Sequence, residues 1–165
     1  MAITRTPIID DDGTGTTGTV INNAWKQELY DQIDAADAAA AWITIPYSAA
    51  DFTASGSMTW TVDAGDVVVL RYLTIGKLAT LLVDLSNTTV GGTPSTHLDF
   101  HLPVALTPAT NLPLMLWVQN PSGAIGMANI VVSGRVLQFY RDTSFTANWT
   151  VGTARIAGSL TFAIA

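Results

Sequence analysis

The stretch VVVLRYLTIGKLATLLVDL, residues 67–85, decides the fold class. Both of its halves are rich in Val, Leu, Ile and Tyr, and residues of this kind are enriched in β-strands. Gly76 stands between the halves, and a glycine between two such runs is typical of a tight hairpin turn. The stretch therefore predicts two antiparallel strands joined by a turn.

Similar short runs continue on both sides of this hairpin, from residue 42 to the last residue. They are WITIP, MTWTV, HLDFHLP, LPLMLWVQN, GMANIVVSG, RVLQFYR, FTANWTV and ARIAGSLTFAI. VSGRV around Gly134 predicts a second tight hairpin, whereas SNTTVGGTPST (86–96) and LTPATNLP (106–113) predict longer loops. About ten short strands at this spacing predict a mainly β domain over 42–165, an antiparallel β-sandwich of the jelly-roll type.

The period of the apolar residues changes before residue 42. They recur at three- and four-residue steps, at Ile21, Trp25, Leu29, Ile33, Ala36 and Ala40, with polar residues on the other faces. This pattern predicts one amphipathic α-helix over 20–41. Two interpretations of the apolar stripe remain open. It packs on the protein's own body, or identical helices of neighbouring subunits bundle through Ile21, Trp25, Leu29 and Ile33, which makes these the candidate oligomerisation residues.

Residues 1–19 are predicted to form an extended arm. The segment is mostly Asp, Gly and Thr, so it buries too little apolar surface to offset the entropy of ordering it, and it would order only against a partner. Asp10, Asp11 and Asp12 followed by Gly13 suggest a calcium loop, but the remaining ligand positions do not fit, which favours a solvated acidic turn. GTGTTG (13–18) lacks the preceding strand and the Gly-Lys ending of a phosphate loop.

Composition limits the classes of partner. The chain has 165 residues, a formal net charge of −6, no cysteine, and seven basic residues that are scattered singly. The absence of a basic cluster argues against nucleic acid. No signal peptide or membrane-spanning run is recognisable, so we expect a protein that is made in a cytoplasm and has no membrane partner. Sparse charge together with many apolar residues favours self-association into a homo-oligomer.

The motif STHLDFHLP carries the strongest candidate chemistry. On a strand, His97, Asp99 and His101 point to one face and the intervening apolar residues to the other. The three side chains could ligate a divalent metal, but the absence of any other histidine favours a polar outer strand face, and we expect neither a metal nor another cofactor. No nucleophile elbow or pair of catalytic carboxylates is recognisable, so we do not expect an enzyme.

Tryptophans raise the possibility of a binding module. Trp60, Trp117 and Trp149 lie in strand-like runs and are predicted to be buried, while Trp42 is predicted to pack where the helix meets the body. A tryptophan exposed on a loop would offer a platform for a sugar ring. The first loops to consider for a glycan are 87–96 and 107–112.

The stretch TRTPIIDDDGTGTTGTVINNAWKQELYDQID (4–34) resembles the N-terminal module of tailed-bacteriophage virion proteins, in which an Asp/Gly/Thr arm leads into an NNAW…LY…ID helix. The segments DFTASGSMTWTV, YLTIGKLATLLVDL and TTVGGTPSTHLDFHLP are similar to β-rich domains that follow such arms.

The resemblance implies a virion component, often a trimer, that attaches to major capsid or tail proteins. The expected particle-anchoring residues are Thr4, Arg5, Pro7, Ile8, Ile9, Asp10, Asp11 and Asp12. Because the chain contains no shaft of repeats, a capsid decoration or head-fibre protein is favoured. The alternative is a short tail fibre or adhesin whose β domain binds a host cell-surface glycan.

Overall fold

The computed structural model describes residues 23–39 and 41–165, which fall into a helical unit ending at Ala41 and a β-rich unit, Trp42–Ala165, called the body below. Helix α1 covers Asn23–Ala39, inside the range predicted from the apolar stripe. The predicted arm, including all the candidate anchoring residues, lies outside the described residues, as do Ile21 and the side chain of Trp25.

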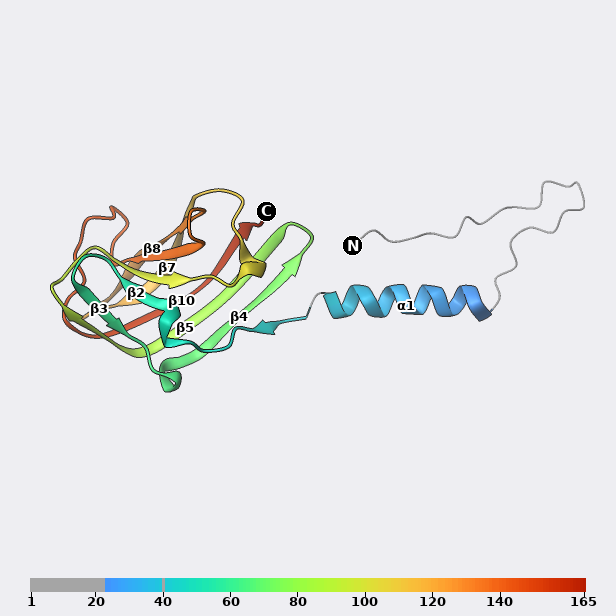
Figure 1. Cartoon of the computed structure of the whole chain (residues 1–165), viewed down its shortest axis with the longest axis horizontal. Coiled ribbons are helices and arrows are strands. Elements are labelled where there is room, and N and C mark those ends of the chain that lie inside the picture. Colours follow the sequence, from blue (N-terminus) through green and yellow to red (C-terminus); the bar gives the residue numbers. More distant parts are fainter. Residues whose placement is uncertain (1–22, 40) are drawn as a thin grey trace, which may run out of the picture. The chain divides into compact units, whose positions relative to one another are not determined.

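The body contains ten strands and three short 3-10 helices (Figure 1). The strands are β1 (Ile43–Thr44), β2 (Phe52–Ala54), β3 (Met58–Thr61), β4 (Val67–Ile75), β5 (Leu78–Gly92), β6 (His97–His101), β7 (Leu112–Gln119), β8 (Gly123–Val131), β9 (Val136–Tyr140) and β10 (Gly152–Ala163). The 3-10 helices are η1 (Ala49–Asp51), η2 (Ala64–Asp66) and η3 (Val104–Leu106). The mainly antiparallel β class predicted from the sequence is confirmed.

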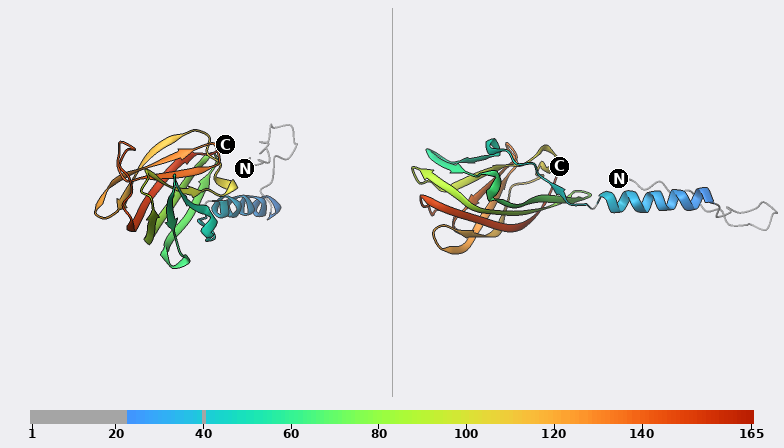
Figure 2. Two further views of the ribbon diagram at one scale, coloured as in Figure 1. Left: turned by 60° about the vertical axis from the view of Figure 1, so that its left-hand side comes forward. Right: turned by 90° about the horizontal axis from the view of Figure 1, so that it is seen from below.

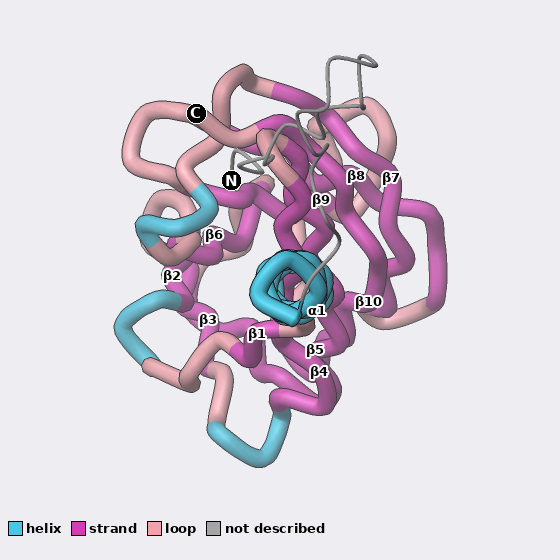
Figure 3. Tube along the Cα trace, turned by 90° about the vertical axis from the view of Figure 1, so that its right-hand side faces the viewer, coloured by secondary structure: helices cyan, strands magenta, loops and turns pink. Residues whose placement is uncertain are grey.

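All ten strands belong to one antiparallel sheet in the order β1-β4-β5-β10-β7-β8-β9-β6-β2, with β3 paired to β5. The sheet curls so that the strands follow one another around the body (Figure 3). β10 and β7 share only three residue pairs, Arg155 with Gln119, Ile156 with Val118 and Ala157 with Trp117, so the pairing between the two halves of the sheet is short. The arrangement is sandwich-like but continuous, and the finer jelly-roll description stays a prediction.

The long strand β5 organises one half of the sheet. It pairs along one edge with β10, while its other edge is shared by β4 and, beyond it, by β3. Figure 2 shows β4, β5 and β10 running side by side from two further directions. The predicted hairpin between β4 and β5 is confirmed, since Gly76 takes a φ of +58° in its turn. β5 therefore joins its neighbour in the sequence, β4, to the distant strand β10.

An aromatic cluster closes the curled sheet. Phe52 of β2 lies against Trp60 of β3 at a ring-centroid distance of 5.3 Å and against Phe100 of β6 at 5.2 Å. Trp60 also meets Phe139 of β9 at 6.0 Å. All four rings are buried, and aromatic pairs of this kind stabilise a fold by about 0.5–1.5 kcal/mol each beyond their area burial. The cluster therefore ties β2 and β3 to the rest of the sheet.

Two predictions of local structure are wrong, and one strand was missed. Residues 145–151 form no strand, because Asp142 accepts hydrogen bonds from the Ser144 hydroxyl and from the backbone amide of Thr146 and so builds a turn. Residues 86–92, the first part of the predicted loop 86–96, continue β5. Gly92, with a φ of +70°, gives the close approach to β3 that this pairing needs, since a Cβ there would lie 2.4 Å from the Ser57 carbonyl oxygen. β2 was not anticipated.

The tryptophans follow the prediction only in part. Trp60 and Trp149 are buried, as predicted, but Trp117 is 36% exposed on the outer face of β7. The run around Trp117 is apolar on both strand faces, so alternation alone does not select the inward residues, which are Leu116 and Val118. Trp42 is exposed, and the Arg71 guanidinium carbon lies 4.9 Å from the centre of its ring.

Candidate functional site

A bulge in β5 shapes a surface pocket of the body. Ala154 pairs with Thr88 and Ile156 pairs with Leu85, so that two residues of β5 oppose the single residue Arg155 of β10. One of these two β5 residues, Asn87, has a φ of +63°, in the left-handed region that asparagine tolerates better than most residues. Bulges re-aim side chains and recur beside binding sites.

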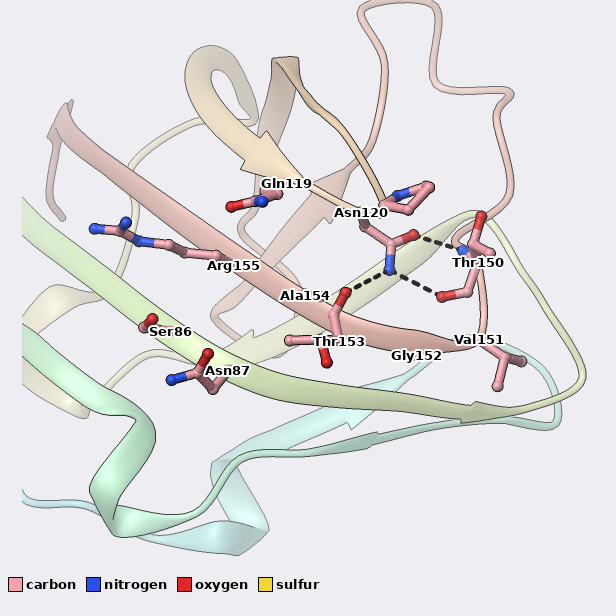
Figure 4. Close-up of a pocket in the computed structure, with 11 residues that line it drawn as sticks. Ser86, Asn87, Gln119, Asn120, Thr150, Val151, Gly152, Thr153, Ala154 and Arg155 are labelled. Atoms are coloured by element: carbon pink, nitrogen blue, oxygen red, sulfur yellow. Dashed lines mark hydrogen bonds between the residues drawn. The ribbon is translucent and has the colours of Figure 1, made fainter.

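A pocket with a volume of about 450 Å³ opens over this bulge (Figure 4). It is lined by Ser86, Asn87, Gln119, Asn120, Pro121, Thr150, Val151, Gly152, Thr153, Ala154 and Arg155. The lining therefore comes from β5, from the end of β7 and from the start of β10, which are distant in the sequence but adjacent in the sheet. The volume falls within the range of about 300–1,000 Å³ that is usual for ligand pockets.

Asn120 fixes one wall of the pocket. Its Nδ2 donates to the carbonyl oxygens of Thr150 at 2.9 Å and Thr153 at 3.2 Å, and its Oδ1 accepts from the Thr150 amide at 2.7 Å (Figure 4). The Asn120 side chain is buried, so three hydrogen bonds satisfy most of its capacity. Asn120 is therefore a positioning residue that holds residues 150–153 beside the bulge.

An ion pair lies at the opposite end of the pocket. Arg155 donates to Asp84 Oδ1 through Nε at 3.0 Å and to Asp84 Oδ2 through Nη2 at 2.9 Å, and this two-point contact raises the pKa of the guanidinium. The Arg155 guanidinium carbon also lies 5.5 Å from the centre of the Trp117 ring. Gly123 of β8 also lies beside the indole, and a Cβ at this position would come within 3.1 Å of the ring.

The remaining polar groups of the pocket have spare hydrogen-bonding capacity. Asn87 and Gln119 are exposed, and their side chains make no hydrogen bond to any other described residue. The two amides offer both donors and acceptors. A lining rich in amides, hydroxyls and backbone groups suits a ligand with many hydroxyl groups better than an apolar one.

The sequence pointed to little of this pocket. Asn87 is the first residue of the loop 87–96 chosen for a glycan, but the other suspected loop, 107–112, contributes nothing to the lining. The exposed indole that a sugar platform needs belongs to Trp117, on a strand and not on a loop. Ser86 and Asn87 gave a usable signal, since they interrupt the strict alternation of β5.

The candidate metal residues lie together on the outer face of β6, as predicted. Leu98, between the first two of them, is buried. His97 Nε2 is 3.7 Å from Asp99 Oδ1, and His101 Nε2 lies 3.4 Å from the hydroxyl of Thr53. Within residues 23–39 and 41–165, however, no group of three or more His, Asp or Glu side chains is placed to hold a metal ion.

Asp99 is the least satisfied carboxyl of this outer face. Its Oδ1 is buried and has no hydrogen-bond partner among the described residues. Burial raises the pKa of Asp99, and the nearby His97, Gln138 and His101 lower it by smaller amounts. Tyr140, whose ring centre lies 5.3 Å from that of His97, also has a raised pKa, first from burial and then from the Asp99 charge. The cluster is a tightly packed polar patch.

Two of the candidate oligomerisation residues can be examined on α1. Leu29 is 39% exposed and Ile33 is 54% exposed in the single chain, one turn apart on the predicted stripe. Tyr30, beside them and outside the stripe, is 57% exposed. None of the helices in the described part of the chain is long and apolar enough to cross a membrane.

Comparison with known proteins gives one structural similarity. No family model and no curated protein matches this sequence. The crystal structure of the receptor binding protein (gp15) of Listeria phage PSA matches with a TM-score of 0.49 and 16% sequence identity, over 93% of this chain and 84% of that chain. A likeness of this strength carries no argument about the function of this chain.

Proposed function

We propose that this chain is a structural component of a bacteriophage particle, held in the particle by its N-terminal segment. The observation that carries the proposal is the sequence of residues 4–34, which resembles the attachment module of virion proteins. The division of the chain into a helical unit and a separate β body is what such a module requires. The proposed role is structural and not enzymatic.

In its finer form, the proposal is a trimeric capsid decoration or head-fibre protein. Three copies would bundle through the stripe on α1 that contains Leu29 and Ile33, both exposed in the single chain. Three linked arms would then engage neighbouring capsid subunits together, and linkage multiplies their affinity. The chain itself contains no repeated shaft that would carry a body far from the particle.

Quantitative mass spectrometry of separated heads and tails tests the location. We expect hundreds of copies on each head, because a decoration protein follows the number of capsid subunits. A few copies confined to the tails would overturn the decoration assignment and leave the particle assignment standing. Absence from purified particles would refute both.

A second assignment, an adhesin on a short tail fibre, is favoured by the pocket over β5, β7 and β10. Its unpaired amides, Asn87 and Gln119, point to recognition of a hydroxyl-rich ligand, as a cell-surface glycan would be. In this case the arm docks on a tail protein instead of on the capsid. Few copies on tails, together with glycan binding by the full chain, would favour this assignment.

A further inference from the structure

We infer that the pocket over the β5 bulge binds an uncharged saccharide and selects against anionic glycans. The inference rests on the second assignment above, and it adds the charge class of the ligand and the residues that determine it. Three features support it: the neutralised ion pair at one end, the unpaired amides of Asn87 and Gln119, and the wall of residues 150–153 that Asn120 holds by hydrogen bonds.

An ion pair neutralises the charge of the pocket lining. Arg155 is the one charged residue in the lining, and it donates two hydrogen bonds to the carboxylate of Asp84. The pair therefore presents no net positive charge to a ligand, and two of the guanidinium N–H donors, on Nε and Nη2, are already used for the Asp84 carboxylate. An anionic ligand would have to compete for the Arg155 guanidinium with the Asp84 carboxylate, which already lies within hydrogen-bond distance of it.

Arg141 does not add positive charge to the pocket lining. Arg141 touches the wall from outside the pocket, where its Nη1 donates to the Thr150 hydroxyl at 2.6 Å, and it does not itself line the pocket. The chain as a whole carries a formal charge of −6. Long-range electrostatics thus also disfavour the approach of an anionic polymer.

Uncharged polar groups of the lining remain available to a ligand. Asn87 and Gln119 each offer an amide donor and an acceptor without an intramolecular partner in the described residues, and Ser86 adds a hydroxyl beside them. Groups of this kind pair well with sugar hydroxyls, which both donate and accept. Because Asn120 already holds the 150–153 wall, little conformational entropy would be lost there on binding.

The test uses the full chain on a glycan array that contains neutral oligosaccharides and anionic ones bearing phosphate, uronate or sialate groups. We expect binding to be confined to a subset of the neutral glycans. Asn87→Ala and Gln119→Ala should each weaken that binding by about five- to tenfold, as expected for one lost hydrogen bond to a ligand. Ser159→Ala, on the exposed face of β10 outside the pocket, is the matched control and should leave binding unchanged.

A variant of Asp84 tests whether the ion pair with Arg155 excludes anionic glycans. Asp84→Asn frees the Arg155 guanidinium, so this variant should gain binding to anionic glycans by about tenfold over wild type. The double variant Asp84→Asn/Arg155→Gln should lose that gain. Both positions face outward, and circular dichroism together with the oligomer size would confirm that the variants fold.

Several outcomes would overturn the inference. They are wild-type binding to anionic glycans as strong as to neutral ones, no binding to any glycan on the array, or neutral-glycan binding that Asn87→Ala and Gln119→Ala leave intact. Incorporation into particles is measured in parallel. If the wild-type protein is present in particles but binds no glycan on the array, the pocket inference alone is refuted. If the protein is absent from particles, the proposed function is refuted.

Discussion

Thr88 links the core to the pocket through two hydrogen bonds. Its buried hydroxyl accepts from the Trp60 indole nitrogen at 3.0 Å and donates to the Ala154 carbonyl oxygen at 3.0 Å. Trp60 belongs to the aromatic cluster, and Ala154 lines the pocket beside the bulge. One small side chain thus holds the β5 bulge in register with β10.

Thr88→Val keeps the shape of this side chain and removes both hydrogen bonds. Because the buried indole N–H then has no partner, we expect the free energy of unfolding to fall by about 1–3 kcal/mol. Urea denaturation followed by tryptophan fluorescence measures the change. Thr80→Val is the control, since Thr80 pairs with the exposed hydroxyl of Thr161 at 3.0 Å and should cost far less. Equal losses for both variants would show that the buried network is not the cause.

Asp99 predicts a specific dependence of stability on pH. Burial raises its pKa in the folded chain, so the protonated form is the one that folding favours. Its stabilising contribution is complete below the pKa of an unfolded aspartate and is lost as the pH rises through the higher folded value. His97, His101, Gln138 and Tyr140 face the same carboxyl, and none of them reverses this direction.

Asp99→Asn should therefore be at least as stable as wild type at pH 7. The ionisation of Asp99 lowers the stability of the wild type between pH 4 and pH 7, and the variant should not show this part of the decrease. Urea unfolding at the two pH values checks the prediction. Asp51→Asn, in η1, removes one carboxylate of the same charge and serves as the control. A variant that is weaker than wild type at pH 7 but equal at pH 4 would contradict the assignment.

Individual residues were predictable where burial alone decided them. The alternation of STHLDFHLP placed Leu98 and Phe100 in the core and the three polar residues outside, and the structure agrees. Trp117 was predicted to be buried because its strand is apolar on both faces, so that alternation alone did not identify Leu116 and Val118 as the inward residues. The ion pair of Asp84 and Arg155 was invisible because its partners are 71 residues apart.

At the scale of elements, helix α1 carries the prediction about assembly. Leu29→Gln/Ile33→Gln replaces two exposed apolar side chains with residues of similar or better helix propensity, so the helix should persist while the apolar seam is lost. Under the proposed trimeric assembly, we expect light scattering coupled to size exclusion to give a trimer for the wild type and a monomer for the double variant.

Tyr30→Gln is the matched control for this experiment. Tyr30 is more exposed than Leu29 or Ile33, at 57%, but lies outside the stripe. The substitution should therefore leave the oligomer intact. Loss of the oligomer in Tyr30→Gln alone would place the seam on another face of the helix.

Strands were predictable when their pairing was local. The β4–β5 and β8–β9 hairpins follow directly from two apolar runs around a turn, and Gly134, with a φ of +80°, sits in the second turn as expected. β2 was missed since its three residues are a strand only through pairing with β6. The C-terminal part of β5 looked like loop because its glycines serve close packing against β3.

At the scale of the whole molecule, the body has a sheet whose integrity depends on its last strand. β10 lies between β5 and β7, and its register with β5 joins Leu78 to Ala163 and Gly152 to Val90. These contacts are remote in sequence, so closing them costs loop entropy before any burial offsets it. A fold with this topology is expected to form as one cooperative unit.

Residues 42–165 should fold without the helical unit, because the buried core consists of residues of the body. We expect this fragment to be monomeric, to retain the urea midpoint of the unassembled full chain at equal concentration, and to keep buried tryptophan fluorescence. Residues 42–151, which lack β10, should not fold, since β5 and β7 would each lose the partner that joins them. A cooperative transition in 42–151 would mean that the two halves of the sheet are independent, and the pocket between them would then be an assembly of two mobile parts instead of a preformed site.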